Sequence, residues 1–342
     1  MITYWIYKFE VEDRDIGVVD YATFEEAKNI PLPTVSMCFV NPFLSKKLNE
    51  TDPKINSALY AQYLNGEIFN ETFNHIDYEN VTLSLQNYFL GGSVRSRNGT
   101  HFRNASSQFK HKIIFSGFYD SAFVKCFEVA VNKTGIPSIR YVGLYYNTKK
   151  LLNDLDKKVK IELFFEFPGQ FLMATHHPTR IKLSREGVKV RSEIRSMEIL
   201  MRRETRNKRC TRKWRVYDEL VLKKHIKING CSPPYFRPYK NVDKCNAKED
   251  IQKSKYDFHE IRSKYFPKPC QRISKIQTHV TNFPSKGKFG FQIMYPEELK
   301  LITQSKEVDV HALIGNIGGY IGLLIGKSQY SIIVFATYII GK

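Results

Sequence analysis

Six cysteines are the most reactive side chains of the sequence, and their spacing predicts disulfides rather than metal or redox chemistry. Their number is even, and no two of them have the CxxC spacing that zinc and redox sites use. Lasting disulfides form in an oxidising compartment. We therefore expect three disulfide bonds in a protein that enters the secretory pathway. The cysteines are Cys38, Cys126, Cys210, Cys231, Cys245 and Cys270.

The sequence also contains six acceptor sites for N-linked glycans, in which Ser or Thr follows two positions after an asparagine. All six lie within the first 134 residues. Such a cluster is typical of a surface lobe that faces the outside of the cell. The sites are Asn49, Asn70, Asn80, Asn98, Asn104 and Asn132.

Two other groupings could do chemistry, but neither has the companion residues that the chemistry needs. The Gly-Lys-Ser sequence at 326–328 ends like a phosphate-binding loop, yet Ile321 stands where that loop has its first glycine. His176 and His177 are adjacent, and no third ligand lies at metal-binding spacing. A Ser-His-Asp arrangement cannot be argued either. We therefore expect no enzyme, no metal site and no cofactor.

The formal charge of +19 is unevenly distributed. Residues 1–134 hold 13 Lys/Arg against 15 Asp/Glu, and the remainder holds 40 against 19. The densest basic stretch, Arg180–Lys227, has 17 basic and 6 acidic residues. Such a stretch can bind phosphates or anionic lipid, but no nucleic-acid module frames it. We interpret it as a solvated basic face of an extracellular domain, with no nucleic-acid partner.

The segment from Ala312 to Ile340 predicts a transmembrane helix. Its 29 residues are predominantly apolar, with Lys327 the only formal charge, and about 20 such residues span a bilayer. Glycines spaced by four are typical of helices that pack closely. Since glycine weakens a helix, these glycines favour a packing or pore-lining role over a plain anchor. They are Gly315, Gly318, Gly319, Gly322 and Gly326.

The N-terminal segment bears on the orientation in the membrane. A lone C-terminal helix would leave the preceding residues in the cytosol, where neither glycans nor lasting disulfides form. The start of the sequence lacks the features of a signal peptide, whereas Tyr4, Trp5 and Tyr7 are typical of an aromatic belt at a membrane surface. We therefore expect residues 1–30 to hold the outer end of a first membrane helix, whose bulk is missing from the sequence, and a linker.

Between the membrane segments, residues 31–311 predict a disulfide-bonded, sheet-rich extracellular body. Alternating residues and a proline turn predict a strand within Pro31–Phe43. The polar residues 44–110 predict loops and short helices over the surface. Further strands are expected in 113–132, 161–175 and 181–200, the last of these as a hairpin around Gly187.

A pair of helices is expected next. Apolar residues at helical spacing predict a first helix over 216–226, which Gly230 stops. A second helix is expected to begin at Asn246, since Asn246 and Glu249 have the spacing of a capping box, and to end at Pro267.

The last four cysteines bracket this helical pair. A helical hairpin would join Cys231 to Cys245 and Cys210 to Cys270, which leaves Cys38 for Cys126. Three connectivities of the last four remain open from sequence alone.

Four stretches resemble the degenerin and epithelial sodium channel family, especially its invertebrate members. PLPTVSMCFVNPF resembles the segment after the first membrane helix, and GFYDSAFVKCFEV resembles the strand with its disulfide partner. RRETRNKRC, NGCSPPYF and YFPKPC resemble the thumb region. LIGNIGGYIGLLIGKS resembles the second-helix signature and is the most specific of the four. Together they cover nearly the whole chain, apart from the first helix and a diverged finger region.

The resemblance implies a homo- or heterotrimer of α+β membrane proteins. Each subunit would have a β-rich palm, a glycosylated finger at about 44–110, a two-helix thumb at about 210–270 and a pore-lining helix at 312–340. It implies an amiloride-sensitive, sodium-permeable channel of the plasma membrane. The two membrane helices expected above would place both termini of a complete subunit in the cytoplasm. Its partners would be sodium ions, related subunits, the lipid bilayer and an extracellular ligand.

The resemblance also implies residue roles. Gly326, Lys327 and Ser328 match the family's G-x-S constriction, where the helix breaks and backbone oxygens replace part of the hydration shell of the cation. Ala312 matches the small residue at the pore mouth, and Gly315 matches the position associated with amiloride block.

Lys327 departs from the family pattern, which has a small residue there. Three ammonium groups facing a narrow pore would oppose the entry of sodium. Either Lys327 points away from the pore axis, or the subunit conducts poorly and serves in heteromers. The alternative function is a non-conducting cell-surface glycoprotein or auxiliary subunit that binds an extracellular ligand. Just before the helix, Glu307 and Asp309 are the nearby groups that attract cations.

Overall fold

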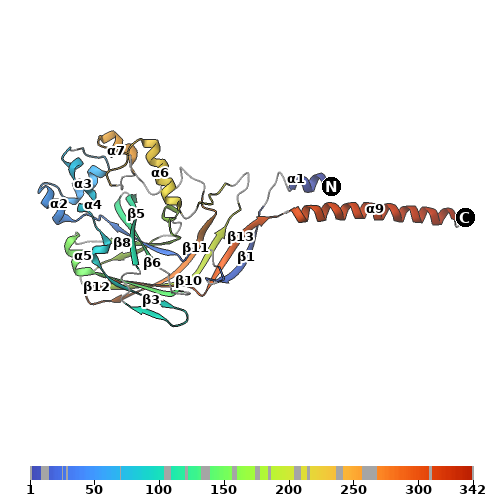
Figure 1. The fold of residues 1–342 in the computed structure, drawn as a ribbon, viewed down its shortest axis with the longest axis horizontal. Helices are drawn as coiled ribbons and strands as arrows, with labels where there is room; N and C mark the ends of the chain where they lie inside the picture. Colours follow the sequence, from blue (N-terminus) through green and yellow to red (C-terminus); the bar gives the residue numbers. More distant parts are fainter. Residues whose placement is uncertain are drawn as a thin grey trace.

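The computed structural model describes residues 2–8, 15–24, 26–27, 30–69, 71–103, 109–119, 122–131, 139–155, 160–173, 178–183, 186–203, 209–213, 216–235, 242–255, 268–307 and 310–340. In the last helix, side chains are described through residue 334. The described chain forms two β-sheets, a group of short helices and one long C-terminal helix (Figure 1). The predicted α+β class, rich in sheet, is confirmed.

The larger sheet has eight strands and includes β1 and β13, the strands next to the two terminal helices. Within it, β10 pairs in parallel with β12 along its first half and with β13 at its end, and β11 pairs antiparallel with the other edge of β10 along its whole length. Its path is β1 (Asp15–Thr23), β13 (Glu298–Lys306), β10 (Val188–Met201), β12 (Lys288–Met294), β7 (Ile139–Asn147), β3 (Phe89–Ser96) and β4 (His101–Arg103), with β11 (Gln271–Pro284) beside β10.

The smaller sheet has five antiparallel strands, with the strand predicted from Pro31–Phe43 at its centre. A disulfide joins the neighbouring strands β2 and β6. The strand order is β5 (Phe109–Tyr119), β6 (Ala122–Val131), β2 (Thr34–Val40), β8 (Lys160–Glu166) and β9 (Thr179–Lys182).

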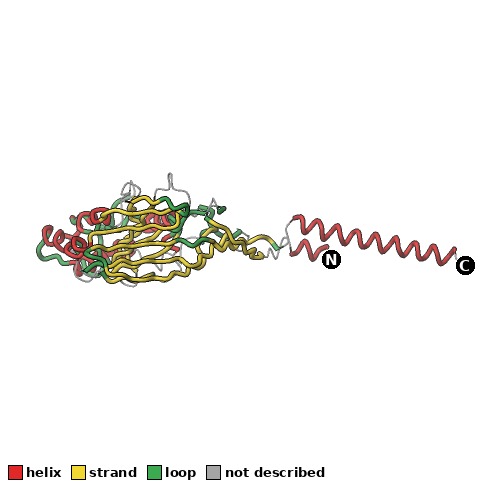
Figure 2. The backbone as a smooth tube through the Cα atoms, turned by 90° about the horizontal axis from the view of Figure 1, so that it is seen from below, coloured by secondary structure: helices red, strands yellow, loops and turns green. Residues whose placement is uncertain are grey.

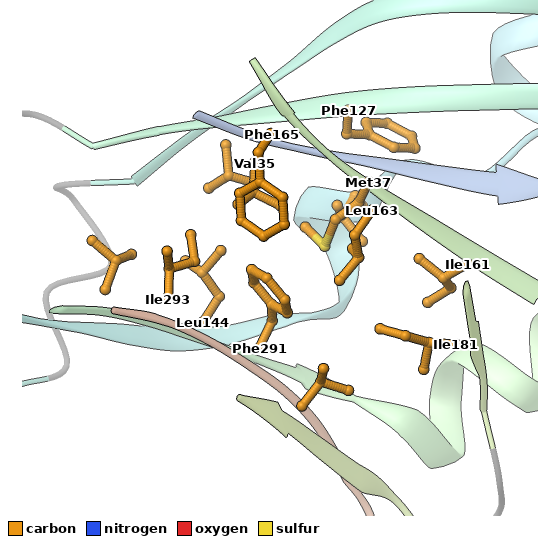
Figure 3. Close-up of a cluster of buried hydrophobic side chains, with 14 of the residues drawn as sticks. Val35, Met37, Phe127, Leu144, Ile161, Leu163, Phe165, Ile181, Phe291 and Ile293 are labelled. Carbon is orange, nitrogen blue, oxygen red and sulfur yellow. The ribbon is translucent and has the colours of Figure 1, made fainter. Parts of the chain in front are cut away.

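The two sheets face each other across a hydrophobic core (Figure 3). Val35 and Met37 of β2 point toward Leu144 and Phe291 of the larger sheet. The opposite face of β2 is buried too, since Cys38 lies in a second core beneath the helices. Burying one large apolar side chain stabilises a fold by about 1.5–3 kcal/mol. The smaller sheet is therefore held as the middle layer between the larger sheet and the helices.

Short helices rich in aromatic residues pack on that second core. Tyr60 and Phe43 have ring centroids 5.5 Å apart, and both are buried. The helical segments are α2 (Ser45–Thr51), α3 (Ser57–Leu64), η2 (Glu71–His75), α4 (Tyr78–Val81), η3 (Leu85–Tyr88), α5 (Thr148–Asp154), η5 (Phe171–Met173), α6 (Tyr217–Asn229) and α7 (Lys248–Ser254). The first thumb helix is confirmed, and it ends at Gly230 in the left-handed conformation, with φ 78°.

Three expectations about local structure are wrong. β9 pairs with β8, whereas β10 pairs with β11, β12 and β13, so Gly187 connects two sheets rather than the strands of one hairpin. Residues 89–103 hold β3 and β4 of the larger sheet instead of surface loops alone. The second thumb helix has Ala247 as its N-cap, without the side-chain hydrogen bond expected from Asn246. The expected end of that helix at Pro267 lies outside the described residues.

Candidate functional site

The long helix α9 (Val310–Ile340) contains the residues to which the sequence assigns a pore. Its 31 residues correspond to about 46 Å at about 1.5 Å per residue. Figures 1 and 2 show that it extends away from the sheets. The expected C-terminal helix is confirmed as a helix. Among the described residues, no helix has both the length and the mean hydropathy that a membrane crossing requires.

A two-stranded ribbon joins α9 to the body of the protein. β13 leads into α9, and β1 follows α1 (Ile2–Tyr7). The two strands pair antiparallel in unbroken register from Asp15 opposite Lys306 to Thr23 opposite Glu298. Nine consecutive residues of each strand are paired, so the ribbon ties the two strands next to the terminal helices to each other.

The helix α1 lies beside the first turns of α9 (Figure 1). An ion pair supports this arrangement, with Lys8 Nζ 3.6 Å from Glu307 Oε1. Tyr4 and Tyr7 remain about half exposed. The residues of α9 that are partly covered recur at helical spacing, as expected for one face under α1. They are Ala312, Leu313, Asn316, Ile317 and Tyr320.

The five glycines form a second face of α9. At about 100° per residue, they lie within an arc of about 100°, centred about 130° from the face toward α1. A Cβ atom added at any of them would meet no atom within 4 Å. From Ile321 to Val334 every residue is exposed, apolar side chains included. The glycine face, comprising Gly315, Gly318, Gly319, Gly322 and Gly326, is therefore open to another helix.

The expected break at the G-x-S sequence does not occur. The helix continues through Gly326, Lys327 and Ser328, and the Ser331 hydroxyl donates a hydrogen bond of 2.9 Å to the Lys327 carbonyl oxygen. Gly326 lies on the glycine face, whereas Lys327 and Ser328 lie about 120° and about 140° from its centre. A regular helix therefore separates the three residues that the sequence grouped together.

All three predicted disulfides are present. Cys38–Cys126 joins adjacent residues of β2 and β6, with the Cα atoms 4.0 Å apart. Cys210–Cys270 and Cys231–Cys245 bracket α6 and α7, with Cα separations of 5.0 and 5.2 Å. Closing loops of this length stabilises a fold by about 3–5 kcal/mol per bond in the chain-entropy account. The disulfides thus hold the helical pair against the sheets.

A buried carboxyl group fixes the start of α6. The Asp218 side chain accepts hydrogen bonds from the backbone N–H groups of Phe171, at 2.7 Å, and Leu172, at 3.0 Å. Burial raises the pKa of Asp218 to about 7; the two hydrogen bonds oppose this rise, and Glu128 and Glu166 reinforce it. The contact joins α6 to the turn η5 that follows β8. Nothing in the sequence pattern pointed to it.

A buried lysine fixes the other side of the helical layer. Lys125 on β6 is fully buried, and its Nζ donates to Glu79 Oε2 at 3.0 Å and to Thr82 Oγ1 at 2.8 Å. The same ammonium group lies 5.0 Å from the ring centroid of Tyr78. The contact connects α4, in the predicted finger, to the smaller sheet. In the sequence, the position of Lys125 next to the disulfide cysteine Cys126 is the one signal that indicated its burial.

The glycosylation and metal candidates are described only in part. Asn49, Asn80 and Asn98 are exposed, as glycan attachment requires. The other candidates, Asn70, Asn104, Asn132, His176, His177 and Asp309, lie outside the described residues.

Comparisons with known proteins give little further identification. No protein-family model matches the chain, and no curated protein matches it. Among solved structures, the chain is similar to a proton-activated chloride channel determined by cryo-EM, over 99% of this chain and 90% of that one. The identity is 6% and the TM-score is 0.27, which is too low to assign a shared fold or activity.

Proposed function

We propose that this chain is a subunit of a trimeric, sodium-permeable channel of the degenerin and epithelial sodium channel type, in which α9 crosses the plasma membrane and lines the pore. The observation that carries the proposal is α9 itself. It is a 31-residue helix with one formal charge that leaves a disulfide-bonded body and presents an open face of five glycines.

The exposure pattern of α9 supports a membrane position. Beyond Tyr320, apolar side chains are exposed on every side of the helix, and a bilayer is a solvent in which such exposure is favourable. Glycines on one face let helices of neighbouring subunits approach closely. With that face turned toward the axis of a bundle, the narrowest level would lie near Gly326, the last of the five.

The same geometry answers the objection raised by Lys327. When the glycine face is turned toward the axis, the Lys327 side chain points about 120° away. Its ammonium group then points toward a neighbouring helix instead of the ion path. The polar side chain nearest the glycine face at this depth is Gln329, about 40° from the centre of the face. An uncharged amide can take the place of water around a sodium ion without repelling it.

The two sheets and their helices would lie outside the cell and would gate this pore through the β1–β13 ribbon. Displacement of the larger sheet would move β13, and β13 continues into α9 at Val310. Ala312, in the first turn of the helix, is the residue we assign to the pore mouth, and Gly315, one turn deeper, is the residue we assign to amiloride block.

Voltage-clamp recording tests this proposal in cells that express the chain, joined at its N-terminus to a membrane helix, with Ala312→Val. A larger side chain at Ala312, which lies on the face of α9 toward α1, is expected to hold the pore open and to increase an amiloride-sensitive inward sodium current several-fold. Ile325→Val is the matched control, since Ile325 is exposed and lies off the glycine face. Unchanged current at normal surface expression would remove Ala312 from the gate. Absence of sodium current from every variant at the cell surface would favour a non-conducting glycoprotein or auxiliary subunit.

A further inference from the structure

A cavity of about 630 Å³ lies on the face of the larger sheet that is turned away from the smaller sheet. Its walls include residues of β3, β4, β7, β10 and β12, and three of them are arginines. Small-molecule sites commonly measure about 300–1,000 Å³. The volume therefore suits an organic molecule rather than a single ion. The arginines are Arg95, Arg140 and Arg191.

The strand register places the cavity floor across four neighbouring strands. Ser93 on β3 is opposite Gly143 on β7, which is opposite Gln292 on β12, which in turn is opposite Arg191 on β10. In the next row, Arg95 is opposite Tyr141. With strands about 4.8 Å apart and a rise of about 3.4 Å per residue along a strand, Arg95 and Arg191 stand about 16 Å apart, on opposite sides of the floor. Their long side chains can reach one ligand from both sides.

The floor is a hydrogen-bonded polar surface. Gln292 is buried, and its Nε2 donates to the Tyr145 hydroxyl at 2.9 Å. The side chains of Ser93, Tyr141 and Tyr145 are hydrogen-bonded to one another. Burial raises the pKa of Tyr145, but hydrogen bonds from Tyr141 and Gln292 outweigh it and the net pKa is lowered. These hydroxyl groups are therefore already oriented by their neighbours.

A glycine in the middle of the floor lets two of the hydroxyl groups lie close to the backbone. A Cβ atom at Gly143 would lie 2.7 Å from the Tyr141 hydroxyl and 2.8 Å from Ser93 Oγ. Any other residue at position 143 would therefore displace these hydroxyl groups. The missing side chain at Gly143 lets these two hydroxyl groups pack directly over the backbone of β7.

The charge of the cavity is not balanced within the described residues. No carboxylate of that part of the chain lies within 4 Å of Arg95, Arg140 or Arg191. Lys189 on the same face of β10 adds to the positive charge, and Glu193 is the acidic residue nearest on that strand. Guanidinium groups bind carboxylate and phosphate oxygens through paired hydrogen bonds. The unbalanced charge thus favours an anionic ligand.

We propose that this cavity is a binding site for a small soluble organic anion that carries two or more carboxylate or phosphate groups. Arg95 and Arg191 bind the anionic groups from opposite sides, and the hydroxyl groups of Tyr141 and Ser93 bind the middle of the ligand. The residues that line the cavity belong to strands of the larger sheet and none of them to α9, which suits a soluble molecule and not a lipid. The proposal stands independently of the channel function, since binding requires no current.

Calorimetric titration of the purified full-length chain with ATP, citrate and inorganic phosphate tests the site. We expect ATP or citrate to bind with one site per chain, and phosphate to bind more weakly because it cannot reach both arginines. Arg95→Gln and Arg191→Gln should each weaken binding at least tenfold. Tyr141→Phe, which removes one hydroxyl group and leaves the charge unchanged, should weaken it several-fold.

Arg195→Gln is the matched control. Arg195 is exposed on the same strand as Arg191 but does not line the cavity. The two lie about 13 Å apart along β10, beyond the screening length of about 8 Å at physiological salt. Binding in this control should change less than twofold. Equal losses in Arg195→Gln and Arg191→Gln would reveal non-specific attraction and overturn the proposal. Lack of binding of all three anions to the wild type, or unchanged binding in a folded Tyr141→Phe variant, would overturn it as well.

Discussion

The pKa of Asp218 predicts a stability that falls as the pH rises from about 4 to about 7. In the folded protein, burial next to Glu128 and Glu166 raises the pKa of this carboxyl group from 3.8 to about 7. In the unfolded chain the group ionises near its ordinary value. Between these two pH values only the folded state holds the proton, so unfolding releases it and a higher pH favours unfolding.

The magnitude follows from the width of this interval. Each pH unit between the two pKa values changes the free energy of unfolding by about 1.4 kcal/mol. Asp218 alone should therefore lower the stability by up to about 4 kcal/mol between pH 4 and pH 7. The stabilisation that comes from the protonated Asp218 is fully present below pH 4 and is lost above pH 7. Burial lowers the pKa of His111 to about 4, which acts in the opposite direction over the same interval, so a single pH profile of the wild type would mix the two.

A difference measurement isolates Asp218. Asp218→Asn has nearly the same size and no charge at any pH. Denaturant unfolding of both proteins, followed by circular dichroism between pH 4.5 and pH 7.5, gives their difference in stability at each pH. The advantage of the wild type should shrink by several kcal/mol across this range. Asp250→Asn, an exposed residue in the first turn of α7, is the matched control. A difference that does not vary with pH would refute the argument from burial.

Two further predictions concern stability and use the same unfolding measurement. Glu79→Ala should lower the free energy of unfolding by about 3 kcal/mol, because it removes the carboxylate that pairs with the buried ammonium group of Lys125. Lys125→Met should lower it by less than about 1 kcal/mol, since the exposed Glu79 can be hydrated. Equal losses in the two variants would contradict this account of the pair. Gly187→Ala should destabilise more than Gly99→Ala, because both residues have positive φ but only at Gly187 would a Cβ atom meet backbone, 2.0 Å from the Ser285 oxygen. Equal losses of about 1 kcal/mol, the usual cost of positive φ alone, would exclude a steric contribution.

The sequence predicted those strands and helices whose periodicity, prolines and glycines lie within the element itself. The alternation and the prolines around Cys38 indicated β2, and helical spacing with a final glycine indicated α6 and its end at Gly230. The positions of the last four cysteines around the helical pair predicted both thumb disulfides, although other pairings remained open. These signals depend on neighbours in the chain, which a sequence displays directly.

The pairing of distant strands could not be predicted in the same way. β9 and β10 look like a hairpin because Gly187 separates them, but β10 pairs with three strands whose paired residues lie 70 or more positions later. Pairing with those three strands, rather than any local signal, decides that β10 joins the larger sheet instead of forming a hairpin with β9. The contacts of Asp218 and Lys125 depend on the same long-range packing. The expected break at Gly326 came from a family resemblance, and the regular hydrogen bonding of α9 prevailed.

The anion cavity shows which part of a site is hidden in a sequence. The basic stretch that includes Arg191 was visible and was interpreted as a solvated face. Arg95 and Tyr141 come from other parts of the chain, and only the strand register brings them into one cavity with Arg191. A charge count alone could not distinguish a dispersed basic face from a binding site.

The central claim, that the glycine face of α9 lines a sodium pore, is tested most directly by cysteine substitution under voltage clamp. All six native cysteines are in disulfides, so an introduced cysteine supplies the sole free thiol. A cationic, thiol-reactive methanethiosulfonate reagent should block sodium current in Gly322→Cys, on the glycine face, and leave current in Lys327→Cys unchanged. Block at Lys327→Cys without block at Gly322→Cys would contradict the account, because it would place the opposite face of α9 in the ion path.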